Sequence, residues 1–172
     1  MKILIDNGHG LGNPNGSPAF DGDGHDPATA IVAPGKVRYF EYKFTRLIAR
    51  QLCQRLLDAG YDAQLLVPEE KDVSLAERSG RANRIWQNTG KQCILISIHS
   101  DAAKGGPWAE ARGWSAYTSP GQTQADGIAD SLYQAAEEVF AGHRIRKDYS
   151  DSDPDLESSF YILKATRCPA VL

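Results

Sequence analysis

The sequence predicts an α/β fold in a single domain, and three observations lead to it. Two apolar runs of strand length, residues 2–6 and 93–98, each lead into a histidine flanked by small or polar residues, as happens at the edge of an open α/β sheet. Segments with the helical spacing of apolar residues lie between the strand-like runs. With 172 residues and 41% apolar composition, the chain is large enough to bury one core.

A long loop and a hairpin are expected after the first strand. The stretch from Gly10 to about Thr29 is rich in Gly, Asn, Pro and Asp and has no period, which predicts a surface loop over the site. Pro34-Gly35 is a turn pair that suits a short hairpin between residues 30–33 and 36–39. Loops of this length are usually functional, so the site is expected beneath it.

Three helices are predicted from the spacing of apolar residues. The first covers residues 40–59, and its core-facing stripe is expected to be Phe44, Leu47, Ile48, Leu52 and Leu56. The second begins with the capping box Ser74-Leu75-Ala76-Glu77 and runs to about Trp86. The third covers residues 122–141.

The remaining strands are predicted at residues 62–67, 93–98, 113–118, 160–163 and 170–172. The run 93–98 is apolar without alternation, which is typical of a strand covered on both faces, so we expect it at the centre of the sheet. Together with residues 2–6, these segments predict a sheet of about six strands. The acidic segment 148–157 is expected to be a loop.

Composition excludes several classes of function. The net charge of −3, from 19 basic and 22 acidic residues, leaves no broad basic surface for nucleic acid. No stretch approaches the roughly 18 apolar residues of a membrane span. Met1-Lys2 runs directly into the first strand, so no signal peptide is visible, and the chain is expected to be cytoplasmic as written or a mature fragment without its leader. Cys53, Cys93 and Cys168 form no close pair in sequence and are expected to be free, buried thiols.

The two strand-end histidines suggest a metal site. Catalytic zinc commonly takes three protein ligands from histidine and carboxylate groups and leaves one position for water. His9 and His99 supply two ligands, and Glu41, near the start of the first long helix, is the candidate for the third. A carboxylate at a helix N-terminus is also stabilised by the helix dipole, which is the alternative explanation of Glu41. The combination favours a metal more than any one residue does.

Other candidate sites are weaker. Asp21-Gly22-Asp23-Gly24-His25-Asp26 and Asp151-Ser152-Asp153-Pro154-Asp155 look like metal loops, but neither has the ligand spacing of an EF-hand, so solvated turns are expected. The serines at positions 97, 100 and 115 lack a nucleophile-elbow context. His25 and His143 lie in polar segments and are expected to be exposed.

Four ordered motifs also carry a family resemblance. Asp6-Asn7-Gly8-His9-Gly10, then Glu41, then Ser97-Ile98-His99-Ser100-Asp101-Ala102, and finally Pro169-Ala170-Val171-Leu172 resemble the zinc-dependent N-acetylmuramoyl-L-alanine amidases of the type-3 catalytic domain. Arg78, with Ala82-Asn83, also resembles a recurring Arg-x-x-x-Ala-Asn pattern of that family. The resemblance covers the whole chain, residues 1–172, as one catalytic domain.

The resemblance implies a twisted, mostly parallel sheet flanked by helices on both faces, and a peptidoglycan hydrolase. The substrate would be peptidoglycan or a muropeptide, cleaved between N-acetylmuramic acid and L-alanine. Zn²⁺ would be bound by His9, Glu41 and His99, and would lower the pKa of its water and polarise the scissile carbonyl. We expect the enzyme to act on the cell wall as a monomer, in the periplasm or outside the cell if it is released or exported.

The resemblance places the general base just beyond the printed sequence. In the family, a glutamate two residues after the Pro-Ala-Val-Leu segment takes the proton from water, so we expect the natural chain to continue past Leu172. Asp101, Glu110 and Glu157 lack this motif context and are expected to be solvated carboxylates. Residues 102–112 are too few for a helix that blocks the zinc, which predicts a permanently open site.

Two other classes of function stay open at this point. An inactive, zinc-containing module that only binds peptidoglycan would keep the three ligands and lack the base. Another zinc peptidase or deacetylase would share the ligands and cleave a different amide. Products from purified muropeptides separate the three, because only an amidase releases a stem peptide with a free N-terminal alanine.

Overall fold

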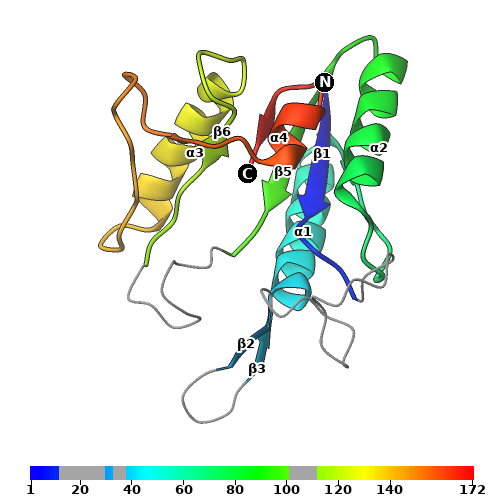
Figure 1. The fold of residues 1–172 in the computed structure, drawn as a ribbon, viewed down its shortest axis with the longest axis horizontal. Helices are drawn as coiled ribbons and strands as arrows, with labels where there is room; N and C mark the ends of the chain where they lie inside the picture. The colour runs from blue at the N-terminus through cyan, green and yellow to red at the C-terminus, as the bar shows by residue number, and fades with distance from the viewer. Residues whose placement is uncertain (12–29, 33–37, 101–111) are drawn as a thin grey trace.

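The computed structural model describes residues 1–11, 30–32, 38–100 and 112–172 (Figure 1). In chain order its elements are β1 (Lys2–Asn7), β2 (Ala30–Val32), β3 (Arg38–Phe40), α1 (Glu41–Asp58), β4 (Asp62–Leu65), α2 (Leu75–Asn88), β5 (Cys93–Ile98), β6 (Tyr117–Thr118), α3 (Asp126–Val139), β7 (Leu156–Glu157), α4 (Tyr161–Ala165) and β8 (Ala170–Val171). Outside the described residues lie the expected loop at 12–29 with Asp21–Asp26 and His25, the Pro34-Gly35 turn, Asp101, Glu110 and the short connection 102–111.

A parallel sheet of four strands forms the centre of the molecule, in the order β4-β1-β5-β8. β6 and β7 pair in a second parallel sheet. Tyr117 of β6 and Leu172, which follows β8, exchange two backbone hydrogen bonds of 2.7 and 3.0 Å, so the second sheet adjoins the edge of the first. The predicted α/β fold is therefore confirmed. The predicted sheet of about six strands corresponds to the four-stranded sheet and the two-stranded sheet taken together.

Helices cover both faces of the central sheet (Figure 1). Ile3 and Ile5 of β1 pack with Ala49 and Cys53 of α1 on one face. Leu4, between them, points to the other face, where α2 and α4 supply the cover. Strands buried on both faces explain why β1 and β5 are apolar without alternation. A third cluster joins α3 to β8 and to the chain before β6; its buried members are Ala116, Ala125, Ala129, Tyr133 and Val171.

The rotation of α1 differs from the prediction. Phe44 and Leu47 were expected in the core but are 44% and 56% exposed. The helix instead buries a face that carries polar groups near its start: Glu41, Tyr42, Thr45, Arg46, Ala49 and Cys53. The polar members have fixed partners, since the Thr45 hydroxyl donates to the Gly8 carbonyl at 2.9 Å and Arg46 donates to Val67 and Glu69 carbonyls. These hydrogen bonds fix the first half of the helix, whereas Leu52 and Leu56 in its second half pack against the core as predicted.

Two segments near the C-terminus differ from their predicted structure. Residues 160–163 were expected to form a strand, but residues 161–165 form α4, which buries Ile162 and Leu163 against α2. A short apolar run has no period by which helix and strand can be told apart, which explains the error. The strand predicted at 113–118 is reduced to β6, with an isolated bridge between Trp114 and Ile145. The acidic segment 148–157, expected to be a loop, ends in β7.

Several local features of the structure correspond to features of the sequence. The Ser74 hydroxyl accepts a hydrogen bond from the Glu77 N–H at 3.3 Å, which caps α2 as the sequence indicated. Gly60 follows α1 with a φ of +85°, a left-handed conformation suited to glycine. The three cysteines are free and buried. Within the described ranges, none of the helices is both long and apolar enough for a membrane span.

Candidate metal centre

The three predicted metal ligands meet at the carboxyl ends of β1 and β5. His9 follows β1, His99 follows β5, and Glu41 is the first residue of α1. β1 and β5 are parallel neighbours in which Asn7 pairs with Ile98, so both histidines leave the sheet at the same edge. One ligand atom from each of the three residues lies within 4.8 Å of the other two. In the part of the chain that the structure describes, this is the one such group of metal-ligating side chains.

A single carboxylate oxygen of Glu41 is the meeting point of the group. Oε1 lies 3.2 Å from Nδ1 of His99 and 3.7 Å from Nε2 of His9, and it accepts a hydrogen bond of 2.8 Å from the Ser100 N–H. The two imidazole rings meet edge to face, with centroids 5.1 Å apart and an interplanar angle of 80°. Two imidazoles and one carboxylate are the donor set of a catalytic zinc site with three protein ligands.

The electrostatics of the centre favour the carboxylate form of Glu41. Burial opposes ionisation of this side chain, which is only 5% exposed. The hydrogen bond with His99, the charge of His9 and the Ser100 N–H act in the opposite direction and lower the pKa of Glu41 below its usual value. Glu41 is therefore ionised at neutral pH, as a metal ligand must be. Metal binding requires no proton to leave this carboxylate first.

Two glycines allow the strand ends to come this close. A Cβ at Gly8 would lie 2.3–2.6 Å from three ring atoms of His99, and a Cβ at Gly10 would lie 2.3 Å from the backbone of Asp72. Both distances are shorter than any real contact of this kind. A side chain at Gly10 would therefore collide with backbone atoms, and one at Gly8 would force the His99 ring to move. The histidine between them has a φ of +62°, in the left-handed region that few non-glycine residues adopt.

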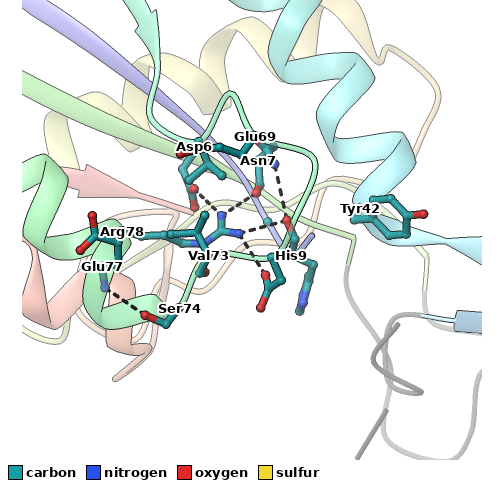
Figure 2. Close-up of polar contacts among 12 residues, drawn as sticks. Asp6, Asn7, His9, Tyr42, Glu69, Val73, Ser74, Glu77 and Arg78 are labelled. Atoms are coloured by element: carbon teal, nitrogen blue, oxygen red, sulfur yellow. Dashed lines mark hydrogen bonds and ion pairs between the residues drawn. The ribbon is translucent and has the colours of Figure 1, made fainter. Parts of the chain in front are cut away.

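A buried arginine holds this strand end in place (Figure 2). Arg78 of α2 is 1% exposed, and its guanidinium donates to Asp6 Oδ1 at 2.6 Å and to the carbonyls of Asn7 and His9 at 2.7 and 3.0 Å. The other Asp6 oxygen accepts a hydrogen bond of 2.7 Å from Ser97 of β5. Asp6 thus links α2 to both strands that lead to the histidines.

An apolar cavity of about 480 Å³ opens beside the metal centre, between α1, α3 and the sheet. Its lining is mostly hydrophobic: Phe44, Ile48 and Leu52 come from α1, Ile96 and Ile98 from β5, Leu132 from α3 and Val171 from β8. His99, Ser100 and Arg146 lie at the polar part of its wall. Three members of the stripe that was predicted to pack α1 onto the core therefore line this cavity: Phe44, Ile48 and Leu52.

The other candidates from the sequence do not join the centre. Ser97 is buried and its hydroxyl donates to Asp6, and His143 is exposed as expected. Glu157 lies exposed in β7. The segment 151–155 was interpreted as a solvated turn, and this is wrong for Asp155, which is 1% exposed and accepts a hydrogen bond of 2.6 Å from Thr118.

Burial accounts for the unusual titration of Asp155. Burial, together with the neighbouring Asp153 and Asp126 carboxylates, raises the pKa of Asp155 to about 6. This cluster anchors β6, through Thr118, to the chain before β7. Its residues are spaced as an isolated acidic turn in the sequence, so no pattern indicated that one of them is buried.

Sequence reasoning also missed the parts of the centre that support the ligands. Arg78 was noted as part of a motif, but its contacts with Asp6 and with the carbonyl of His9 were not foreseen. Thr45, whose hydroxyl ties α1 to Gly8, was not singled out at all. The partners of these residues lie tens of positions away in the chain, so the only sequence signal was the motif itself.

The comparisons with known proteins agree with this geometry. The model of the N-acetylmuramoyl-L-alanine amidase family matches residues 3–172. No curated protein sequence matches the chain. Among solved structures, N-acetylmuramoyl-L-alanine amidase AmiC2 of Nostoc punctiforme is similar with a TM-score of 0.70 and 17% identity, over 100% of this chain and 77% of that one.

Two further structures show the same fold. Amidase Ami1 from Mycobacterium smegmatis has a TM-score of 0.65 and 17% identity, over 100% of this chain and 80% of that one. The CwlD amidase from Clostridioides difficile, solved in complex with the GerS lipoprotein, has a TM-score of 0.65 and 17% identity, over 99% of this chain and 79% of that one. Because the family match spans almost every residue, the chain belongs to the N-acetylmuramoyl-L-alanine amidases.

Proposed function

We propose that this protein hydrolyses the amide bond between N-acetylmuramic acid and L-alanine in peptidoglycan, with one Zn²⁺ held by His9, Glu41 and His99. The convergence of these three side chains within 4.8 Å, in a chain of the amidase family, is the observation that carries the proposal. The donor set fits zinc because it combines two imidazoles with one carboxylate.

The described residues have distinct tasks in this reaction. When bound, zinc lowers the pKa of a water molecule and polarises the scissile carbonyl. Nε2 of His9 and Nδ1 of His99 face the Glu41 carboxylate and are the nitrogens available to the ion. The Ser100 N–H fixes the Glu41 carboxylate by a hydrogen bond, and Thr45 ties the first turn of α1 to Gly8. These contacts preorganise the ligands before the metal arrives.

The general base is proposed to be a glutamate two residues after Leu172. β8 pairs with β5 so that Ala170 lies opposite Leu95 and Val171 opposite Ile96. If β8 continued at the same register, the second residue after Leu172 would lie opposite His99. A carboxylate there would be close enough to take a proton from the attacking water and deliver it to the amine of the leaving L-alanine.

The substrate determines where the enzyme works. Peptidoglycan lies outside the cytoplasmic membrane, so the proposed site of action is the cell wall, in the periplasm or at the exterior. The protein is proposed to act as a monomer, since all three ligands come from one chain. Size-exclusion chromatography with light scattering tests this, and a stable dimer would contradict it.

Metal analysis tests the proposed site. The wild-type protein is expected to bind one zinc ion per chain, and His99→Ala is expected to abolish stoichiometric binding. His143→Ala is the matched control because His143 is exposed and lies outside the centre. Zinc content unchanged by His99→Ala would place the metal elsewhere and overturn the ligand assignment.

Product analysis tests the reaction. A form of the protein that continues past Leu172 with the proposed glutamate is incubated with purified muropeptides, and the products are identified by mass spectrometry. An amidase releases a stem peptide with a free N-terminal alanine. Binding of muropeptides without cleavage would identify a binding module. Cleavage within the stem peptide or at an acetyl group would identify another zinc hydrolase. Either result would overturn the proposal.

A further inference from the structure

We propose that Arg78 is a positioning residue for the metal centre, which acts by fixing the backbone of His9. The inference rests on the proposed function, because it concerns the affinity of the His9, Glu41 and His99 group for zinc. Arg78 is the largest of the described side chains that are fully buried, and its five hydrogen bonds go to Asp6, to Asp72 and to three backbone carbonyls. Its effect must therefore pass through the chain it holds.

Every donor of the Arg78 guanidinium is used. Nε donates to the Val73 carbonyl at 2.7 Å. One terminal nitrogen donates to Asp6 Oδ1 and to the Asn7 carbonyl, and the other donates to the His9 carbonyl and to Asp72 Oδ1 at 3.3 Å. A guanidinium has five N–H groups in a planar fork, and the five acceptors here match that number. The acceptors come from β1, from the turn that follows it and from the segment before α2.

Two of these acceptors enclose the metal ligand. Arg78 holds the carbonyl of Asn7 and the carbonyl of His9 itself, so both ends of the Gly8-His9 unit are fixed from one side (Figure 2). His9 needs this support because its φ of +62° is unfavourable for a residue with a Cβ. Without the guanidinium, the backbone is free to relax toward the ordinary region, and the imidazole turns away from Glu41.

A lysine cannot reproduce this arrangement. Its ammonium group keeps the charge next to Asp6 but has three donors that radiate from one point, so it cannot reach the carbonyls of Asn7 and His9 in one plane. Arg78→Lys therefore separates the two roles. A side chain that only neutralises Asp6 would be replaced well by lysine, whereas a side chain that aligns the carbonyls would not.

Zinc affinity measures the positioning role directly. We expect Arg78→Lys to weaken zinc binding by about 10–100-fold in a chelator competition titration, the usual effect of losing a group that orients a ligand. The d–d absorption spectrum of the Co²⁺ form should change as well. At saturating zinc, the KM for muropeptide should stay at the wild-type value. Arg81→Lys is the matched control, since Arg81 lies on the same helix but pairs at the surface with Glu69 and Glu77.

A second variant covers the case in which Arg78→Lys fails to fold. Asp72→Ala removes one surface-side acceptor of the guanidinium and leaves the His9 carbonyl as the sole partner of that nitrogen. We expect zinc affinity to fall by about two- to fivefold with an unchanged circular dichroism spectrum, a smaller loss than in Arg78→Lys because the contact with the His9 carbonyl remains.

The outcomes separate this inference from the proposed function. Wild-type protein that binds no zinc would refute the function and the inference together. Wild-type binding with unchanged affinity in Arg78→Lys would refute the positioning role alone. If that variant is unfolded, unchanged affinity in Asp72→Ala would refute it in the same way. Equal losses in Arg78→Lys and Arg81→Lys would show an effect that does not depend on the contacts of Arg78 with the carbonyls of Asn7 and His9, and would also overturn the inference.

Discussion

Replacement of Gly8 by alanine should remove zinc from the centre without unfolding the protein. The new Cβ would lie 2.3 Å from Cε1, 2.5 Å from Nδ1 and 2.6 Å from Nε2 of His99. Ordinary van der Waals contact begins near 3.4 Å, so the ring must move by about 1 Å. Zinc–nitrogen bonds tolerate deviations of only about 0.2 Å. A shift of this size breaks one of three protein bonds to the metal.

The backbone itself accepts the change. Gly8 is absent from the residues with positive φ among the described part of the chain, so alanine suits its conformation. Its N–H keeps the hydrogen bond to the Ile98 carbonyl at 2.9 Å. The His99 side chain is 22% exposed and can turn outward to relieve the contact. The smaller entropy of the unfolded state offsets part of the strain, since Gly→Ala at a compatible position is worth about 0.4–1 kcal/mol.

The expected result is a zinc affinity at least about 100-fold below wild type, with the unfolding free energy of the metal-free protein within about 1 kcal/mol. Affinity is measured by competition with a chelator, and stability by urea unfolding in EDTA. Gly127→Ala is the control, because a Cβ at Gly127 on α3 meets nothing within 4 Å. It should raise stability by about 0.5–1 kcal/mol and leave zinc binding alone. Zinc binding by Gly8→Ala within threefold of wild type would show that the His99 ring does not pack on Gly8.

Two further predictions concern stability. Burial and the Asp153 and Asp126 carboxylates raise the pKa of Asp155 to about 6, so the folded protein holds a proton on this carboxyl more tightly than the unfolded chain does. The stability that Asp155 contributes is therefore fully present below about pH 4 and is lost as the pH rises through 6. The free energy of unfolding of Asp155→Asn, measured in urea, should therefore rise relative to that of the wild type by about 1–3 kcal/mol between pH 4.5 and pH 7.5. A difference between the two proteins that does not change with pH would contradict a buried carboxyl at this position. Leu95 of β5 is 0% exposed, so Leu95→Ala should lower the free energy of unfolding by about 2–5 kcal/mol. Leu57→Ala, at an exposed position of α1, is the control and should change the free energy of unfolding by less than about 0.5 kcal/mol. Equal losses of stability in the two variants would place β5 outside the core.

The sequence predicted the elements whose signals are local. The capping box at Ser74 needs only its own four residues, and the apolar run of β5 is visible without knowledge of its neighbours. The strand predicted at 160–163 failed because four apolar residues carry no period, and only packing against α2 makes them a helix. The rotation of α1 failed because polar contacts of Thr45 and Arg46 with distant carbonyls outweigh its stripe.

The candidate site divides in the same way. His9 and His99 could be named because each ends a strand, and parallel neighbours bring their carboxyl ends to one edge. Glu41 could be named because it begins a helix. The roles of Gly8 and Arg78 could not, because they depend on contacts with His99 and with the turn around His9 that no sequence spacing encodes. That zinc occupies the centre stays a prediction.

All four strands of the main sheet run parallel, so none is joined to its neighbour by a tight turn. The central pair sets Lys2 against Cys93, and more than half of the chain must close into a loop before these strands gain any contact. Pairings of this kind form slowly and late in folding. His9 and His99 stand at the far end of that same pair, so the two imidazoles meet only once the slowest contacts exist. A metal ion added during refolding should therefore stabilise the folded protein without raising the folding rate.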